Sequence, residues 1–277
     1  MQYLEFNIPC NAELGEILMA ELSEVGFDSF LQDEDHIKGY VEQESFDPEE
    51  LRIILEYYNI PQDAIRKSMM ENKNWNEAWE SNYQSVVVAD KCYIRADFHE
   101  PKPQYPYEII IQPKMSFGTG HHATTSQMME LMLVKDLRGK TVLDMGCGSG
   151  LLAILAYKMG AKMITAVDND EWAYKNTLEN IVRNKVQSTH VVLGEIEDVE
   201  HEKYDIILSN ITKNINLEYI AHYAGMMKKN GRLIVSGFYE SDLEDIKNHA
   251  IKFGFRLLSN KTTNNWTAAI FTYDEVL

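Results

Sequence analysis

The sequence predicts an α/β protein in which a mainly parallel sheet carries helices on both faces, with a smaller α+β unit before it. Three observations predict this class. From Glu108 onward, short apolar runs alternate with segments of helical period. The first 70 residues carry a β-α-β-β-α-β pattern of their own. Finally, a turn with three glycines at alternate positions, residues 146–150, joins an apolar strand to an apolar helix.

The composition is that of an ordinary globular protein. The 277 residues are 45% hydrophobic and 25% charged, which allows one large domain or two unequal ones. No apolar run approaches the ~20 residues of a membrane helix, and the N-terminus lacks the pattern of a secretory signal. The three cysteines, Cys10, Cys92 and Cys147, are scattered and lack metal-ligand spacing. We therefore expect a cytoplasmic protein with reduced thiols and no membrane partner.

The charge balance is strongly acidic, with a formal net charge of −17. Such a surface repels phosphate backbones, so we expect no direct nucleic-acid binding. It would instead attract a basic substrate. The alternative is that the acidity only aids solubility.

The N-terminal region, residues 1–70, is expected to fold as a ferredoxin-like unit. Asp47 and Pro48 suit the N-cap and first turn of a helix. The expected elements are a strand at 3–8, a helix at 12–25, two strands within 27–44 around a turn at 32–35, a helix at 49–58 and a strand at 64–69.

A polar segment, residues 71–84, follows this unit. Trp75 and Trp79 are four residues apart, which places them on one face of a short helix. We interpret the segment as a connecting helix whose tryptophans dock on a neighbour; stacking against a substrate is the alternative.

The remaining residues, 85–277, are expected to form the large α/β domain. The tail has two strands without a helix between them, 256–259 and 266–273, which indicates an antiparallel hairpin at the sheet edge. The other expected strands lie at 141–144, 163–168, 190–193, 204–209 and 232–236, with helices between them, for example at 151–159 and 172–183.

The glycine turn indicates the ligand. A dinucleotide site has the spacing G-x-G-x-x-G, but Leu151 stands where the third glycine would be. A G-x-G-x-G turn preceded by an acid, Asp144, suits a ligand that has no phosphates and whose cationic end pairs with a carboxylate. S-adenosylmethionine is such a ligand.

Polar residues at the ends of the expected strands supply the remaining ligand contacts, because ligands of open α/β sheets bind beyond the carboxyl ends. Asp168 is expected to accept the ribose hydroxyls, while Asp170 caps the next helix. Gly146, and less directly Gly148, would contact the ligand through the backbone. Asp144 would organise the turn or face the ligand ammonium through water. Glu195 is expected near the adenine.

Two further segments belong to the predicted site. Asn210 ends a strand, and its amide oxygen can accept a hydrogen bond from an ammonium or from a target amine. The loop 115–125 is rich in glycines and hydroxyls and is expected to fold over the cofactor, with Thr125 donating to it. The adjacent residues His121 and His122 have no partner at metal-ligand spacing, so we expect no metal.

Taken together, these motifs resemble the PrmA family, bacterial methyltransferases of large-subunit ribosomal protein eleven. The glycine turn alone indicates only a seven-strand methyltransferase, whereas the Phe-Gly-Thr-Gly-x-His-x-Thr-Thr loop is more specific. The matching segments are Phe117–Thr125, Leu143–Ile154, Val167–Asp170, Asn176–Asn184 and Ser209–Ile211.

The resemblance implies a Rossmann-like seven-strand methyltransferase sheet and a substrate-recognition role for residues 1–70. It implies that Thr125, Gly146, Asp168 and Asn210 contact S-adenosylmethionine. It also implies methylation of lysine side chains and of the N-terminal amine of ribosomal protein eleven, with no dedicated base and with Asn210 positioning the amine or the cofactor. The chain departs from the family pattern at 112–116 and at Thr212, which bears on the amines modified.

Two other functions stay open at this point. One is a methyltransferase of a glutamine amide or a nucleobase amine. Such enzymes often carry Asn-Pro-Pro-Tyr where this chain has Asn210-Ile-Thr-Lys. The other is a non-catalytic S-adenosylmethionine-binding protein that assists ribosome assembly. The intact glycines, Asp168 and Asn210 argue against it.

Overall fold

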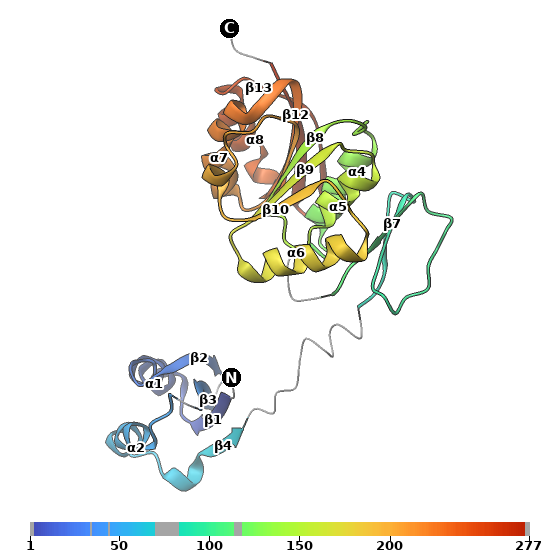
Figure 1. Ribbon diagram of the computed structural model, residues 1–277. Helices are drawn as coiled ribbons and strands as arrows, with labels where there is room; N and C mark the ends of the chain where they lie inside the picture. The colour runs from blue at the N-terminus through green and yellow to red at the C-terminus, as the bar shows by residue number, and fades with distance from the viewer. Residues whose placement is uncertain (1–2, 34, 44, 70–82, 114–117, 275–277) are drawn as a thin grey trace. The chain divides into compact units, whose positions relative to one another are not determined.

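The chain forms two compact units, which divide between Ala78 and Trp79 (Figure 1). The computed structural model describes residues 3–33, 35–43, 45–69, 83–113 and 118–274. Apart from Tyr83 and Gln84, the expected connecting helix and its two tryptophans lie outside the described residues. Each unit is described by itself below.

The N-terminal unit has the predicted ferredoxin-like arrangement. Its four strands are ordered β2-β3-β1-β4, and every neighbouring pair is antiparallel. Its elements are β1 (Tyr3–Pro9), α1 (Ala12–Glu24), β2 (Phe27–Gln32), β3 (His36–Glu42), α2 (Pro48–Tyr57), a 3-10 turn (Gln62–Ala64) and β4 (Arg66–Met69).

Local chemistry sets the ends of both helices in this unit. The Asn11 side chain accepts a hydrogen bond from Leu14 N at the start of α1. As predicted, Asp47 caps α2 through Glu49 N, and Pro48 occupies the first turn. The two helices and the sheet enclose a separate hydrophobic core that includes Leu4, Phe6, Ile8, Leu18, Leu22, Ile37, Leu51 and Leu55.

The second unit contains the expected seven-stranded sheet, ordered β10-β9-β8-β11-β12-β14-β13. Neighbours from β10 to β12 are parallel, and β14 is antiparallel to both β12 and β13, as the hairpin prediction required. The strands are β8 (Thr141–Met145), β9 (Met163–Asp168), β10 (Thr189–Leu193), β11 (Tyr204–Asn210), β12 (Met227–Tyr239), β13 (Phe255–Thr263) and β14 (Trp266–Tyr273).

Strand order reverses at β8. The chain proceeds from β8 to β9 and β10 on one side, and then returns to place β11 on the other side. In an open α/β sheet this switch point is where ligands bind. The glycine turn follows β8 and Asn210 ends β11, so both lie at this point.

Helices cover both faces of the sheet (Figure 1). α4 (Ala123–Leu133), α5 (Leu151–Lys158) and α6 (Glu171–Arg183) contribute Met128, Leu155 and Ile181 to one hydrophobic cluster. α7 (Lys213–Met226) and α8 (Leu243–Ile251) contribute Ile220 and Ile246 to the cluster on the other face. No helix among the described residues is both long and apolar enough to cross a bilayer.

A third, three-stranded sheet precedes the main one in the chain. It is ordered β5-β6-β7, from β5 (Val86–Val88), β6 (Cys92–Arg95) and β7 (Tyr107–Ile110). The buried residues Cys92, Ile94 and Ile109 join the cluster under α4 and α5. β6 and β7 are parallel, and this pairing depends on contacts across the loop between them, which no local sequence pattern encodes.

Candidate functional site

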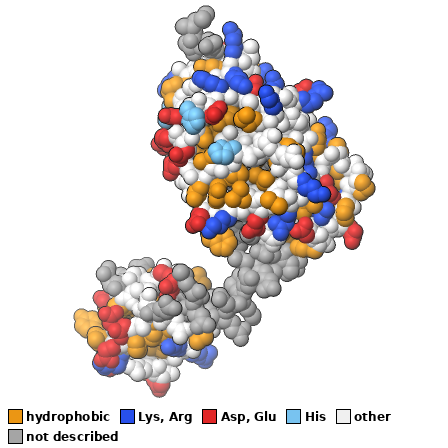
Figure 2. All heavy atoms as spheres, viewed as in Figure 1, with side chains coloured by type: hydrophobic (Ala, Val, Ile, Leu, Met, Phe, Trp, Pro, Cys, Tyr) orange, Lys and Arg blue, Asp and Glu red, His pale blue; other side chains and the backbone are white. Residues whose placement is uncertain are grey.

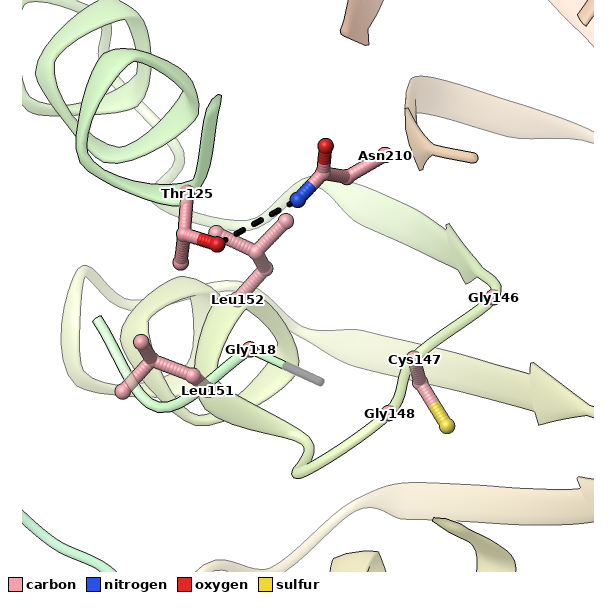
Figure 3. A pocket seen from close by; sticks show the side chains of 8 residues that line it. All are labelled: Gly118, Thr125, Gly146, Cys147, Gly148, Leu151, Leu152 and Asn210. Atoms are coloured by element: carbon pink, nitrogen blue, oxygen red, sulfur yellow. Dashed lines mark hydrogen bonds between the residues drawn. The ribbon is translucent and has the colours of Figure 1, made fainter. Parts of the chain in front are cut away.

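A cavity lies at the switch point of the sheet (Figure 3). Its volume is about 240 Å³, part of it open to solvent. Four of the residues that the sequence predicts as ligand contacts come together in the wall of this cavity. The lining residues are Gly118, Thr125, Gly146, Cys147, Gly148, Leu151, Leu152 and Asn210.

The turn after β8 requires glycine for two reasons. Gly146 has a φ of +70°, a conformation that other residues rarely adopt, and a Cβ there would overlap the Ile211 side chain. Gly150 has a φ of +76° and begins α5, where a Cβ would lie 2.9 Å from Cγ2 of Thr177. The turn is thus packed closely against Ile211 and Thr177, and neither glycine position can hold a side chain.

Asp144 is buried beneath this turn. Its Oδ2 accepts a hydrogen bond from Ala153 N at 3.0 Å, in the first turn of α5, while its Oδ1 is buried without a protein partner. Burial raises the pKa of Asp144 to about 7. One oxygen therefore organises the start of the helix, and the other is left to accept from a cation.

Asp168 ends β9, next to the turn. Its Oδ2 accepts from Gly148 N at 2.8 Å and its Oδ1 from Asp170 N at 3.1 Å. A carboxylate has about four acceptor positions, so two remain for ligand hydroxyl groups. Asp170 caps α6 as predicted, accepting from Trp172 N and Ala173 N.

Asn210 and Thr125 face each other across the cavity (Figure 3). Asn210 Nδ2 donates to Thr125 Oγ1 at 3.4 Å, and Asn210 Oδ1 is buried without a protein partner. A buried acceptor left unpaired costs about 1–3 kcal/mol. The amide oxygen of Asn210 is therefore available to accept from a ligand.

Glu195 lies near Asp168 but does not line this cavity. Gly194 N donates to Asp168 O at 3.0 Å, which places the residue after β10 beside the end of β9. The exposed Glu195 carboxylate accepts from Tyr219 Oη at 3.2 Å and from Asn169 Nδ2 at 3.4 Å. These two partners are not singled out by the sequence, because a tyrosine within α7 and an asparagine after Asp168 carry no motif.

Two further contacts escape sequence reasoning. Ser149 Oγ donates to Gly118 O at 2.7 Å and joins the glycine turn to the segment before α4. His122 caps α4 through Thr124 N, and its ring lies 5.0 Å from that of Trp266. Of the adjacent residues His121 and His122, His122 thus serves as the N-cap of α4. Phe117 lies outside the described residues.

Among the residues that the structure describes, no three His, Cys, Asp or Glu side chains are grouped so as to hold a metal ion.

The site fits S-adenosylmethionine by its unsatisfied groups. Asp144 and Asn210 each have one buried oxygen without a protein partner, and Asp168 has acceptor positions that its two hydrogen bonds leave unused. Such acceptors suit the N–H and O–H donors of this ligand and of an amine substrate. Asp168 does not line the cavity itself, but its carboxylate is bonded to Gly148 N in the cavity wall.

The chain is similar to known proteins over nearly its whole length. The sequence model described as "Ribosomal protein L11 methyltransferase (PrmA)" matches residues 2–273. The chain is 40% identical to the ribosomal protein L11 methyltransferase of Phocaeicola vulgatus over 278 residues, covering 98% of this chain and 99% of that protein. It is 40% identical to that of Porphyromonas gingivalis over 263 residues, covering 94% and 91%.

A solved structure gives the same fold. The ribosomal protein L11 methylase of Lactobacillus delbrueckii subsp. bulgaricus superposes with a TM-score of 0.65 at 24% identity, covering 70% of this chain and 100% of that one. The match of the family model over nearly the whole chain, and relatives of equal length at 40% identity, show the family. The chain belongs to the PrmA family of ribosomal protein L11 methyltransferases, whose methyl donor is S-adenosylmethionine.

Proposed function

We propose that this chain methylates lysine side chains and the N-terminal amine of ribosomal protein L11. The observation that carries the proposal is the buried, unpaired Oδ1 of Asn210 in the wall of the cavity. An amide oxygen there accepts from an N–H or O–H donor, and the amino group of a lysine or of a chain terminus is a donor of this kind.

S-adenosylmethionine, when bound, supplies a methyl group on a positively charged sulfur. We assign Asp168 to the ribose hydroxyls, Thr125 and the backbone of Gly146 to direct contacts, and the free oxygen of Asp144 to the ammonium side. Gly148 would contact the ligand through its backbone, and Glu195 would lie beside the adenine. These assignments rest on the free acceptor positions of the three strand-end residues.

The target amine must be neutral before it can accept a methyl group, whereas a free lysine has a pKa of about 10.4. We assign no residue as a dedicated base. The chain would act by positioning the amine against Asn210 and by removing it from water, with solvent accepting the proton. Leu151 and Leu152, which line the cavity, supply an apolar wall for that purpose.

Residues 1–70 are proposed as the substrate-recognition domain, 71–84 as a connecting helix and 85–277 as the methyltransferase domain. Charge supports the first assignment. Residues 1–78 contain five lysines and arginines against 18 acidic residues, a net formal charge of −13, while residues 79–277 contain 21 against 25, a net charge of −4. The smaller unit thus carries most of the attraction for a basic protein. A ribosomal substrate also places the reaction in the cytoplasm.

The test is transfer of labelled methyl groups to isolated ribosomal proteins. We expect label in ribosomal protein L11, on lysines and on the N-terminal amine, and its loss in Asn210→Ala. A control variant, Glu244→Gln on the exposed side of α8, should retain full activity. Label in RNA, on a glutamine amide or in another protein would contradict the proposal. Binding of S-adenosylhomocysteine without any transfer would favour an assembly factor.

A further inference from the structure

Three asparagines spaced by one helical turn, Asn176, Asn180 and Asn184, run along α6 and its C-terminal end. They have no assigned part in the proposed function. Asn176 and Asn180 are fully buried. Asparagine is a poor helix former, and a buried amide is costly unless it is hydrogen-bonded. Their presence on the buried face of α6 therefore requires specific partners.

Asn184 binds the end of the small sheet. Its Oδ1 accepts from Ile110 N at 2.9 Å, and its Nδ2 donates to Ile110 O at 2.6 Å. The side chain thus satisfies both backbone groups of the last residue of β7, as a neighbouring strand would. It holds the small sheet against α6.

Asn180 makes a different connection. Its Oδ1 accepts from Gln112 N at 2.7 Å, while its Nδ2 donates to Ser149 O at 2.9 Å and to Asn176 Oδ1 at 2.6 Å. One side chain therefore joins the segment after β7 to the glycine turn. The two bonds that Nδ2 donates are buried, and a broken hydrogen bond is most costly where water cannot replace it.

The glycine turn is held by two more contacts beside this one. Thr177 Oγ1, on the same face of α6, donates to Gly148 O at 2.8 Å. Ser149 Oγ donates to Gly118 O at 2.7 Å. Gly148 and Gly118 both line the cavity. Two successive carbonyl groups of the turn, those of Gly148 and Ser149, thus accept from side chains of α6.

We infer that Asn180 is a positioning residue of the methyl-donor site, which acts by fixing the Ser149 carbonyl and hence the turn from Gly146 to Gly150. The inference rests on the proposed function, because it concerns the same cavity. With the Ser149 carbonyl bonded to Asn180, the amide groups of the turn keep one orientation before a ligand arrives. Asn184 makes bonds of the same kind but does not touch the turn, so its role is confined to the small sheet.

The test compares the same substitution at two positions one turn apart. Asn180→Asp keeps the acceptor for Gln112 N but replaces the donor to Ser149 O with a carboxylate oxygen, which repels that carbonyl. Asn184→Asp makes the equivalent change toward Ile110 O. Both variants are made in the full chain, checked for folding by circular dichroism and thermal unfolding, and titrated with S-adenosylhomocysteine by calorimetry.

We expect Asn180→Asp to weaken the binding of S-adenosylhomocysteine about tenfold and to raise the KM for the methyl donor without changing the KM for ribosomal protein L11. Asn184→Asp should bind S-adenosylhomocysteine with an affinity within about twofold of wild type, even if its unfolding temperature falls by as much as that of Asn180→Asp. Should Asn180→Asp fail to fold, Asn180→Ala, which leaves room for water, is titrated instead with the same expectation.

Two results would overturn the inference: wild-type affinity in the Asn180 variant, or equal losses of affinity in the Asn180 and Asn184 variants. Absence of binding to the wild-type chain would instead refute the proposed function.

Discussion

The two units of this chain are both built from helices packed on a sheet, but they differ in strand direction and in net charge. The N-terminal unit has an antiparallel sheet with its own core and carries a net charge of −13 in 78 residues. The second unit carries only −4 in 199 residues, but its parallel strands meet at a switch point. The comparison teaches that strand direction locates the chemistry, while surface charge locates the attraction for a basic substrate.

The polar groups of the two units differ in burial. At the switch point, the free oxygens of Asp144 and Asn210 are buried and unpaired. On α2 of the first unit, Arg52 pairs with Glu49 and Glu56 in solvent, where such pairs contribute little stability. In Figure 2, acidic side chains gather along one edge of the smaller unit. Substitutions in the second unit should therefore alter the chemistry and cofactor binding, and those in the first should alter substrate capture.

The largest effect is expected at Asn210. Asn210→Ala removes the acceptor that faces the amine, and we expect kcat to fall on the order of 10²–10³-fold. The KM for ribosomal protein L11 should change little, because we propose that the first unit recognises this substrate. Steady-state kinetics with both substrates varied measures the two effects. A variant that lost only substrate affinity would remove the distinction between the units.

Asp168→Ala should act on the cofactor alone. It removes the acceptors assigned to the ribose and the bond to Gly148 N, so we expect S-adenosylhomocysteine to bind about 100-fold more weakly. Calorimetry measures this affinity, and Glu171→Gln, an exposed position at the start of α6, is the control. Unchanged affinity would show that the ribose assignment is wrong.

The pH dependence of cofactor binding should report on Asp144. Its pKa in the folded chain, about 7, lies above the ordinary value of 3.8 because burial disfavours the charged form. Its protonation therefore stabilises the fold fully below the unfolded pKa, and that contribution is lost as pH rises through about 7. A ligand ammonium needs the ionised form, so affinity for S-adenosylhomocysteine should rise about tenfold from pH 6 to pH 8. Asp144→Asn should flatten this profile, and a wild-type profile as flat as that of the variant would argue against the ammonium contact.

The smallest effect is expected from charge on the first unit. Replacing the exposed residues Glu49, Glu50 and Glu56 by glutamine should slow association with ribosomal protein L11 several-fold at low salt and leave cofactor affinity unchanged. The difference should shrink as salt rises, because the field is screened. Replacing Glu171, Glu179 and Glu244 of the second unit is the matched control. Equal slowing by both sets would assign the attraction to the whole surface.

Much of the fold follows from local rules. The apolar periods predict the order of helices and strands in both units, because a strand repeats every two residues and a helix every 3.6. The N-caps at Asp47 and Asp170 were predicted and are confirmed, since they depend only on neighbouring residues. The expected strand at 232–236 is too short, because β12 pairs with β14 as far as Tyr239.

What the sequence by itself determined is the position of the glycine turn and of the acids and amide at the strand ends, because these depend on backbone conformation and spacing along a few residues. Only the tertiary structure decided which of them share a cavity. The bond between Asn210 and Thr125 joins residues 85 apart, and that between Asn180 and Gln112 joins residues 68 apart. Such contacts arise from the packing of α4 and α6 on one face of the sheet, which no local pattern encodes.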